Sequence, residues 1–294
     1  MGTGCSTGTP DLGCAIERKA FMCGVCRDAL ANLHSPNRRN NPSVLIQLRH
    51  TKKNILIDCG KTFREGALRW FPARGVNALD ALVLTHEHTD AIGGMDDLRD
   101  AQVPSGVLPV FANQFTHNRL VQKYPYLFGE GSDSKSVGRR IAQLEARVIS
   151  KHTKFNVEGL SFTPFDLIHG GSYISLGFAF GSPDEVVYFS DFSEIPEECY
   201  NMLNNRKISV MVLDMLRESP NHPSHPTLAQ TIQVIHRMLK ICEIKKIYLI
   251  GMNHTVDHHP TNLMLNQLFP DGLVELSYDG LTINLDLTPP TANL

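Results

Sequence analysis

The chain has 294 residues, with 28 lysines and arginines against 30 aspartates and glutamates, and its formal net charge is −2. This balance argues against a protein that holds nucleic acid by bulk electrostatic attraction, because such proteins carry an excess of positive charge. No run approaches the roughly 18 apolar residues that a membrane-spanning helix needs, and the first residues lack the basic and apolar regions of a signal peptide. We therefore expect a cytoplasmic protein with no membrane span, whose seven cysteines are thiols or metal ligands rather than disulfides.

The first half of the chain predicts short strands separated by helices. Residues 43–48 and 54–60 are expected to form two strands joined by a polar turn, and residues 81–88 a buried strand that opens into a histidine-rich loop. One helix is expected from Asp96, whose acidic first turn suits a helix N-terminus, and another from Asn113 to Tyr124. The glycine- and serine-rich stretch 129–140 is predicted to be a surface loop.

The second half has the same pattern. Apolar residues three or four apart predict a helix over 227–241, and residues 281–287 alternate in the manner of a final edge strand. No repeat and no change in composition marks a boundary, so we expect a single α/β domain over 1–294, with two sheets faced by helices. Five further strands are predicted, over 160–171, 173–180, 185–193, 208–215 and 245–254.

The strongest functional pattern is THEHTD, Thr85 to Asp90, directly after a predicted strand. Alternate residues of an extended segment project to the same side, so His86, His88 and Asp90 can converge on one point. Two imidazoles and a carboxylate form a ligand set for zinc, with manganese and iron as alternatives. His169 and Asp191 also follow apolar strands, and with the first two histidines they would complete a catalytic zinc site that keeps an open position.

These residues resemble the metallo-β-lactamase fold superfamily. The resemblance extends over nearly the whole chain, and the GTG opening and a downstream CxxC are most similar to the phosphoribosyl cyclic phosphodiesterases of bacterial phosphonate breakdown. It implies a four-layer αββα sandwich with its metals at one rim of the two sheets. The motifs that carry it are GTGCSTGTP, ILIDCG, THEHTDAIGG, FDLIHGG, YFSDFS, VLDMLRESPNHPSH and LIGMNH, in this order.

The resemblance also implies a role for each site residue. His86, His88 and His169 would bind the first metal. Asp90 would belong to the second metal site, and Asp191 would bridge both sites.

The sequence departs from the family at two ligands of the second metal. Ala91 and Gly251 stand where the family has histidines. We therefore expect one tightly bound metal and a weak or empty second site, unless His222, His225 or Asn253 reaches into it. Asp58 would orient a metal-bound imidazole and so tune its basicity.

His225 matches a position at which relatives carry a histidine near the scissile phosphate. It would protonate the leaving oxygen as a general acid; the alternative is a polar residue that only begins a helix. Arg217 is a candidate for binding phosphate, because a guanidinium matches phosphate oxygens, and the alternative is a surface ion pair. His222 is a further candidate for substrate binding.

A second group of residues points to a structural zinc site. Relatives hold this zinc with three N-terminal cysteines and one late histidine. Here the resemblance implies Cys23, Cys26 and His254, with Cys14 as the fourth ligand and Cys5 as its competitor.

We therefore expect a metal-dependent hydrolase, a phosphodiesterase acting on a small or cyclic phosphodiester, that binds zinc and uses a metal-activated water. Asp90 and His225 are its candidate catalytic residues. The alternatives are a thioester or lactone hydrolase and a weakened metal-binding scaffold protein, and a tRNA-processing nuclease is more distant. The near-neutral charge favours a small-molecule partner over a nucleic acid, and a homodimer is compatible with the sequence.

Overall fold

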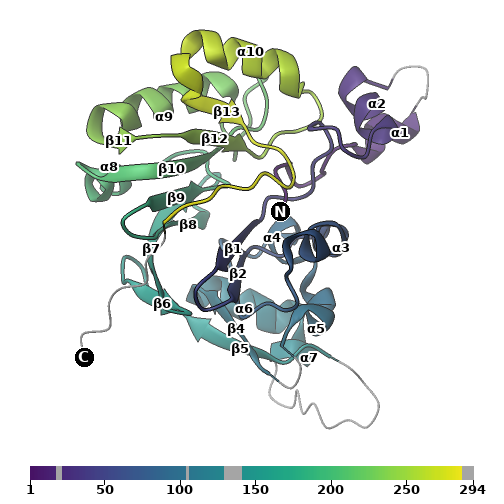
Figure 1. The fold of residues 1–294 in the computed structure, drawn as a ribbon, viewed down its shortest axis with the longest axis vertical. Helices are drawn as coiled ribbons and strands as arrows, with labels where there is room; N and C mark the ends of the chain where they lie inside the picture. The colour runs from purple at the N-terminus through teal and green to yellow at the C-terminus, as the bar shows by residue number, and fades with distance from the viewer. Residues whose placement is uncertain (18–21, 104–105, 129–140, 287–294) are drawn as a thin grey trace.

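The computed structural model describes residues 1–17, 22–103, 106–128 and 141–286. The predicted loop over 129–140 lies outside these residues. Two β-sheets stack face to face, and helices cover the outer face of each (Figure 1). This four-layer αββα arrangement confirms the predicted fold class. None of the helices in the described part of the chain is both long and apolar enough to cross a membrane.

The first sheet has the strand order β1-β2-β3-β4-β5. β1 and β2 form an antiparallel hairpin, and the remaining neighbours are parallel. Its strands are β1 (Val44–Leu48), β2 (Lys53–Ile57), β3 (Ala81–Val83), β4 (Leu108–Ala112) and β5 (Leu144–Val148).

The second sheet has the order β13-β12-β10-β9-β8-β7-β6, with β11 also paired to β10. Its strands β9, β10, β12 and β13 are parallel, whereas β6 to β9 form antiparallel neighbours. The strands are β6 (Phe155–Val157), β7 (Leu160–Ile168), β8 (Ile174–Phe180), β9 (Glu185–Phe189), β10 (Lys207–Asp214), β11 (Glu243–Ile244), β12 (Ile247–Ile250) and β13 (Val274–Leu276).

The helices form the two outer layers. α8, α9 and α10 lie over the second sheet, α3 to α7 accompany the first, and α1 and α2 stand beside the sandwich (Figure 1). Their bounds are α1 (Leu12–Glu17), α2 (Gly24–Ala31), α3 (Phe63–Arg74), α4 (Thr89–Ile92), α5 (Leu98–Ala101), α6 (Gln114–Lys123), α7 (Pro125–Phe128), α8 (Glu197–Leu203), α9 (Leu228–Ile241) and α10 (His258–Leu268), with short 3-10 turns at Met95–Asp97 and Pro270–Gly272.

The strand sequences explain the layers, because side chains alternate between the two faces of a sheet. In β2, Ile55 and Ile57 join the apolar layer between the sheets, and Leu56 joins the layer under the helices. β10 alternates in the same way: Val210 and Val212 point inward, and Met211 and Leu213 point to the helices. Strands buried on both faces are therefore continuous apolar runs in the sequence.

Two predicted helix starts are set by capping. Asn113 accepts a hydrogen bond from the Thr116 backbone N–H at the start of α6. Thr227 and Gln230 form a capping box at the start of α9. Both helices agree with the sequence analysis, which predicted the first from Asn113 and the second from apolar residues three or four apart. The helix predicted from Asp96 is instead a short 3-10 turn followed by α5.

The predicted final edge strand over 281–287 is wrong for its described part. Residues 281–286 are extended but form no ladder, and the last strand is β13. Alternation alone does not make a strand, because a strand also needs a neighbour with which to exchange backbone hydrogen bonds. β3 is also shorter than predicted and ends at Val83, so the histidines that follow lie in a loop.

Candidate metal centre

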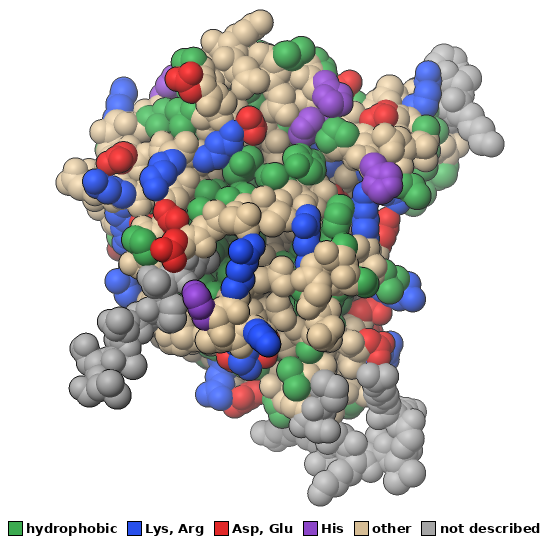
Figure 2. Space-filling view, in the orientation of Figure 1, with side chains coloured by type: hydrophobic (Ala, Val, Ile, Leu, Met, Phe, Trp, Pro, Cys, Tyr) green, Lys and Arg blue, Asp and Glu red, His purple; other side chains and the backbone are tan. Residues whose placement is uncertain are grey.

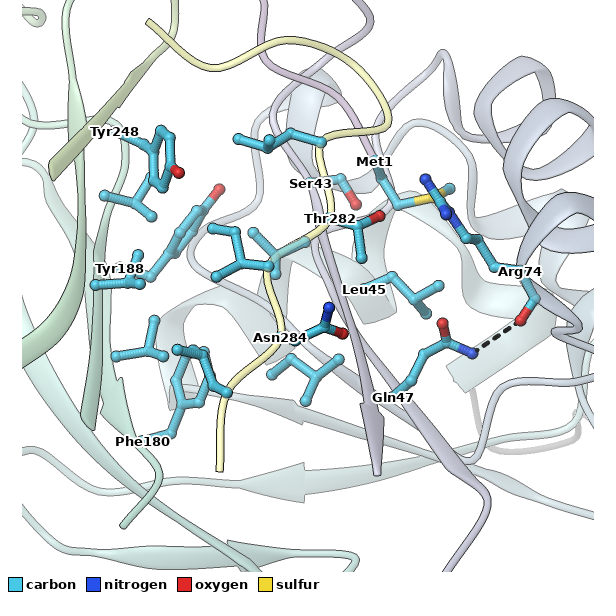
Figure 3. Close-up of a pocket in the computed structure, with 18 of the residues that line it drawn as sticks. Met1, Ser43, Leu45, Gln47, Arg74, Phe180, Tyr188, Tyr248, Thr282 and Asn284 are labelled. Atoms are coloured by element: carbon cyan, nitrogen blue, oxygen red, sulfur yellow. Dashed lines mark hydrogen bonds between the residues drawn. The ribbon is translucent and has the colours of Figure 1, made fainter. Parts of the chain in front are cut away.

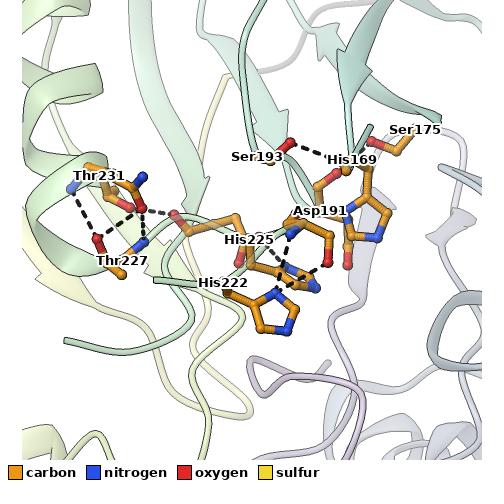
Figure 4. Close-up of polar contacts among 12 residues, drawn as sticks. His169, Ser175, Asp191, Ser193, His222, His225, Thr227 and Thr231 are labelled. Carbon is orange, nitrogen blue, oxygen red and sulfur yellow. Dashed lines mark hydrogen bonds and ion pairs between the residues drawn. The ribbon is translucent and has the colours of Figure 1, made fainter. Parts of the chain in front are cut away.

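The polar THEHTD loop, Thr85 to Asp90, follows β3 and meets the ends of β7 and β9 in the second sheet. The ligand atoms of His86, His88 and His169 lie within 4.8 Å of one another, and so do those of His169, Asp191 and His225. His169 follows β7, and Asp191 follows β9. Figure 4 shows His169, Asp191 and His225 pointing toward one another. The fold thus brings together residues that are far apart in the sequence. His86 and His225, the first and the last of them, are separated by 139 positions.

His86 presents a free ring nitrogen to this group. The Thr85 hydroxyl donates to Asp58 Oδ2 over 2.8 Å, so it accepts from His86 Nδ1–H, also over 2.8 Å. This arrangement leaves the lone pair on Nε2, which is buried and has no hydrogen-bond partner. Burial lowers the pKa of His86 to about 3, which keeps the imidazole neutral. A neutral imidazole with an unpartnered nitrogen fits a metal ion.

The two ring nitrogens of His169 have the same roles as those of His86. Its Nδ1–H donates to the Ser224 backbone carbonyl over 2.9 Å, so Nε2 is free to ligate. Burial lowers the pKa of His169 to about 4. Gly170, with φ +89°, allows the loop that carries Ser224 to approach this closely, since a Cβ there would lie 3.0 Å from the Ser224 Cβ.

Asp191 supplies the carboxylate from a left-handed backbone conformation, with φ +49°. Such a conformation costs free energy for a non-glycine residue and is concentrated at functional sites. Burial by itself would raise the pKa of Asp191, but the nearby imidazoles of His86, His225 and His169 outweigh it and lower the pKa. The side chain is therefore an anion that faces the imidazoles of the rim, as a cation site requires.

Asp90 is buried in the first turn of α4, and it belongs to neither group of converging ligand atoms. Burial, and then the charge of Asp191, raises the pKa of Asp90 to about 7. His169, rather than Asp191, is common to both groups. The implied roles of Asp90 at the second metal site and of Asp191 as the bridging residue stay predictions.

The two positions that lack family histidines are both buried, and at position 251 even a Cβ has no room. Ala91 is buried in the apolar layer under the helices. Gly251 has φ +81°, and a Cβ there would lie 1.9 Å from Asp214 Oδ1. The Asp214 carboxylate thus occupies the space into which a side chain at residue 251 would extend.

Asp58 acts on His86 through the Thr85 hydroxyl. It accepts hydrogen bonds from the Thr85 backbone N–H at 2.9 Å and from the Thr85 hydroxyl, and only that hydroxyl touches the imidazole. Sequence reasoning found Asp58 but missed Thr85, although Thr85 is the first residue of the THEHTD motif.

We expect Thr85→Val to lower the affinity of the rim for zinc by about tenfold or more, because His86 would lose the acceptor that orients its ring. The measurement is a zinc titration against a competing chelator. Thr85→Ser keeps the hydroxyl and serves as the matched control. Equal affinities for the valine and serine variants would contradict this role for Thr85.

His225 is held by a residue that the sequence analysis missed. His225 Nδ1–H donates to Asp214 Oδ2 over 2.6 Å, so Nε2 is directed away from Asp214. Burial lowers the pKa of His225, but the charge and hydrogen bond of Asp214, with Asp191 and Asp90, outweigh it and raise the pKa to about 9. A carboxylate at the end of the apolar strand β10 is the same signal that pointed to Asp191, and it could have identified Asp214.

His222 and Arg217 lie in the loop before α9 and belong to neither ligand group. His222 Nδ1 accepts from the Ser224 backbone N–H at 3.3 Å (Figure 4). The Arg217 guanidinium donates to the carbonyls of Pro220 and Asn221. Both side chains therefore stabilise the loop that positions His225.

The cysteine group also converges. The ligand atoms of Cys14, Cys23, Cys26 and His254 lie within 4.8 Å of one another. Cys23 Sγ lies 3.5 Å from His254 Nδ1. The backbone N–H of Cys26 points at Cys23 Sγ, and that of Cys23 at Cys14 Sγ. Cys5 is not part of the group; its sulfur lies beside the Thr7 hydroxyl.

Comparisons with known proteins show the family and the fold. The family model of the β-lactamase superfamily domain matches residues 53–251. A solved structure, a new diphosphatase from the PhnP family, is 31% identical, with a TM-score of 0.77 over 98% of this chain and 97% of that one. Zn²⁺-bound PqqB from Methylobacterium extorquens has a TM-score of 0.75 over 97% of this chain and 98% of its own at 14% identity, which shows the fold alone.

Two curated relatives are matched over only about half of their own length. An octanoyltransferase of Porphyromonas gingivalis is 30% identical over 286 residues, which is 97% of this chain and 51% of the relative. A ribonuclease Z of Bradyrhizobium diazoefficiens is 28% identical over 148 residues, which is 49% of this chain and 45% of the relative. The chain thus spans about half the length of these relatives. From the family match and the fold, the chain belongs to the metallo-β-lactamase superfamily, and over 98% of its length it is similar to a diphosphatase of the PhnP family.

Proposed function

We propose that the protein is a metal-dependent phosphodiesterase that hydrolyses a small or cyclic phosphodiester. The observation that carries the proposal is His225, a proton donor fixed by Asp214 at 2.6 Å beside the converging ligand atoms of His169 and Asp191. A leaving alkoxide or phosphate oxygen needs a proton, and a positioned imidazolium supplies one. The similarity to a PhnP-family diphosphatase supports phosphate chemistry.

His86, His88, His169 and Asp191 would hold the metal. Three imidazoles and a carboxylate suit zinc, with manganese or iron(II) as alternatives. When bound, such a metal polarises a phosphoryl oxygen and lowers the pKa of a water molecule.

Two residues of the chain would move protons. Asp90, with its pKa raised to about 7 by burial and by Asp191, is suited to accept a proton from the attacking water near neutral pH. His225 carries its mobile proton on Nε2, because Nδ1 is engaged by Asp214. The proton would pass from Nε2 to the leaving oxygen.

The surroundings of the site suit a small substrate. The Tyr173 ring stacks on His88, with centroids 4.9 Å apart and planes 9° apart, and the exposed Phe115 ring meets Tyr173 edge-on at 6.0 Å. Arg119 lies over Phe115, and Lys123 Nζ reaches the Thr89 hydroxyl at 3.3 Å. Two cations and an exposed ring beside the metal ligands match a single phosphate group with a ring attached.

A substrate panel tests the proposal. The zinc- or manganese-loaded protein is expected to hydrolyse bis(p-nitrophenyl) phosphate, a 2′,3′-cyclic nucleotide or a dinucleoside diphosphate with a higher kcat/KM than an acyl thioester or a lactone. A thioester or lactone preference would replace the proposal with the carbonyl-hydrolase alternative. Cleavage of a precursor tRNA in preference to all small substrates would indicate a nuclease, and loaded protein without any turnover would indicate a scaffold.

A second prediction concerns the number of metals at the rim. We propose that one metal binds tightly there, because Ala91 and Gly251 replace two imidazole ligands. Ala91→His is then expected to raise the rim metal content toward two per chain, measured by mass spectrometry of metals after subtraction of the cysteine-site zinc.

Gly251→His, at the second of these positions, is expected to behave differently from Ala91→His. Its Cβ would overlap the Asp214 carboxylate at a backbone φ of +81°, so it is expected to destabilise the fold by about 3 kcal/mol and lower Tm by about 6 °C. Two rim metals of equal affinity in the wild-type protein would contradict the first expectation, and an unchanged Tm for Gly251→His would contradict the second.

A further inference from the structure

The cavity between the two sheets and the metal-binding rim differ in how their polar groups are satisfied. The cavity has a volume of about 330 Å³ and is lined mainly by apolar side chains of β1 and of the inner faces of β8, β9, β10 and β12 (Figure 3). Of the arginines in its lining, Arg49 donates to Asn284 Oδ1 and Arg74 donates to the Gly280 carbonyl. Figure 2 shows this face of the molecule, where hydrophobic side chains gather between lysines and arginines. The rim, by contrast, contains a candidate metal ligand whose ring lacks a hydrogen bond within the chain.

This ligand is His88. The other two histidines of its group, His86 and His169, are each oriented by a hydrogen bond from Nδ1, to the Thr85 hydroxyl and to the Ser224 carbonyl. Neither ring nitrogen of His88 makes a hydrogen bond to another described residue. Metal-binding histidines usually donate their second ring N–H to a protein group, which fixes the orientation of the ring. The torsion that rotates an imidazole has broad minima, so His88 needs another restraint to keep one nitrogen directed at a metal.

The ring of Tyr173 lies against the imidazole of His88. The two rings are stacked, with centroids 4.9 Å apart and planes 9° apart. The same tyrosine ring meets His86 and His169 at steep angles, with centroids 6.3 Å and 5.8 Å away. Offset stacks and edge-to-face contacts at such separations are the favourable arrangements of aromatic rings. Tyr173 therefore contacts all three imidazoles of the group and restricts the rotation of the one that lacks a hydrogen bond.

Tyr173 is itself held at both ends. Its hydroxyl donates to Glu87 Oε2 over 2.5 Å, and its backbone carbonyl accepts from the His169 N–H at 2.8 Å. Within the described ranges, no lysine, arginine or histidine nitrogen lies within 4 Å of the Glu87 carboxylate, so no ion pair competes with this hydroxyl. One side chain thus ties the THEHTD loop to the turn that follows His169.

We propose that Tyr173 is the positioning residue of His88. Its ring, fixed by the bond to Glu87, holds the imidazole in the orientation in which one ring nitrogen faces the metal. Tyr173 thereby does for His88 what hydrogen bonds do for His86 and His169. This role rests on the rim metal of the proposed function, and it requires neither a particular substrate nor turnover.

A zinc titration of the full chain against a competing chelator, with the cysteine site already loaded, tests this role. Tyr173→Leu removes the ring and is expected to lower the zinc affinity of the rim by about fivefold, the contribution of one aromatic stack. Tyr173→Phe keeps the ring and is expected to restore most of this loss. Tyr126→Leu is the matched control, since the Tyr126 hydroxyl donates to Asp96 Oδ1 over 2.5 Å, and neither residue belongs to a ligand group.

Variants of Glu87 test what fixes the tyrosine ring. Glu87→Gln removes the charge but keeps an oxygen that accepts from the Tyr173 hydroxyl, whereas Glu87→Ala removes both. With Tyr173 present, the glutamine variant is expected to bind zinc about threefold more tightly than the alanine variant, the contribution of one hydrogen bond. In the Tyr173→Phe background the two variants are expected to be equal, because the hydroxyl that distinguishes them is absent.

The visible spectrum of cobalt(II) at the rim is a second measurement, because it depends on the geometry of the ligands. With zinc kept at the cysteine site, Tyr173→Leu is expected to change this spectrum, and Tyr173→Phe is expected to keep that of the wild type. A folded Tyr173→Leu variant with wild-type zinc affinity and spectrum would overturn the positioning role, and so would equal losses of affinity in Tyr173→Leu and Tyr173→Phe.

If Tyr173→Leu does not fold, the Glu87 variants decide the matter. A difference between Glu87→Gln and Glu87→Ala that persists in Tyr173→Phe would overturn the role, as would no difference with Tyr173 present. A wild-type rim that binds neither zinc nor cobalt would overturn it together with the metal-dependent function. Metal-loaded wild-type protein without phosphodiester turnover would overturn the phosphodiesterase proposal alone, since neither measurement on Tyr173 involves turnover.

Discussion

His225→Ala is expected to lower kcat by about 100-fold or more on a phosphodiester with a poor leaving group, the usual effect of losing a general acid. The imidazole is fixed by its 2.6 Å hydrogen bond to Asp214, and burial lowers its pKa less than the surrounding carboxylates raise it, to about 9. The loss should be much smaller for a p-nitrophenyl ester, because nitrophenolate leaves without a proton. Steady-state rates for the two esters, compared at saturating substrate, measure this difference.

His236→Ala is the control, since His236 is exposed on α9 and belongs to neither ligand group. Asp214→Asn should reproduce part of the kcat loss, because the amide still contacts Nδ1 but no longer stabilises the imidazolium. Metal content separates the two possible roles of His225. If His225→Ala loses a rim metal together with its activity, His225 is a ligand and the general-acid role is wrong.

Cys23→Ser is expected to lower Tm by about 10 °C while the rim keeps its metal. We infer a structural zinc among Cys14, Cys23, Cys26 and His254, whose ligand atoms lie within 4.8 Å of one another. Burial raises the pKa of the Cys26 thiol to about 12, so a cation is needed to hold it as a thiolate. A structural zinc contributes directly to folding free energy, and we expect the loss of one ligand to cost about 4 kcal/mol or more.

Thermal unfolding and zinc per chain are the measurements, and Cys5→Ser is the control. Cys5 is the alternative ligand that the sequence left open, but its sulfur lies beside the Thr7 hydroxyl, outside the group. Cys14→Ser should therefore resemble Cys23→Ser, and Cys5→Ser should keep its zinc. Full zinc content and stability in Cys23→Ser would show that the group holds no structural metal.

The structure places these two groups on different parts of the fold. The rim group joins the end of β3 in the first sheet to the ends of β7 and β9 in the second sheet. The cysteine group joins α2 to the loop after β12. A change at the cysteines is thus expected to affect the attachment of the N-terminal segment, while a change at His225 is expected to affect chemistry.

The sequence determined the sandwich and most of the residues at the rim. Apolar runs such as 208–213 alternate between two buried layers, which only a sheet covered on both faces allows. Polar ligand types at strand ends, above all His86 and His88, identified the rim, because neighbouring strand ends meet in space. Residues close together in the sequence also determined where α6 and α9 begin, because each cap is a hydrogen bond between residues three positions apart.

Tertiary structure decided the contacts between segments far apart in the chain. The link from Asp58 through Thr85 to His86 depends on two strands lying side by side. The partnership of Asp214 with His225, and the exclusion of a side chain at Gly251, depend on how β10, β12 and one loop pack together. Residues 281–286 alternate like a strand but form no ladder, and they line a cavity between the sheets instead. Such outcomes depend on which surfaces meet, and periodicity along one segment does not contain that information.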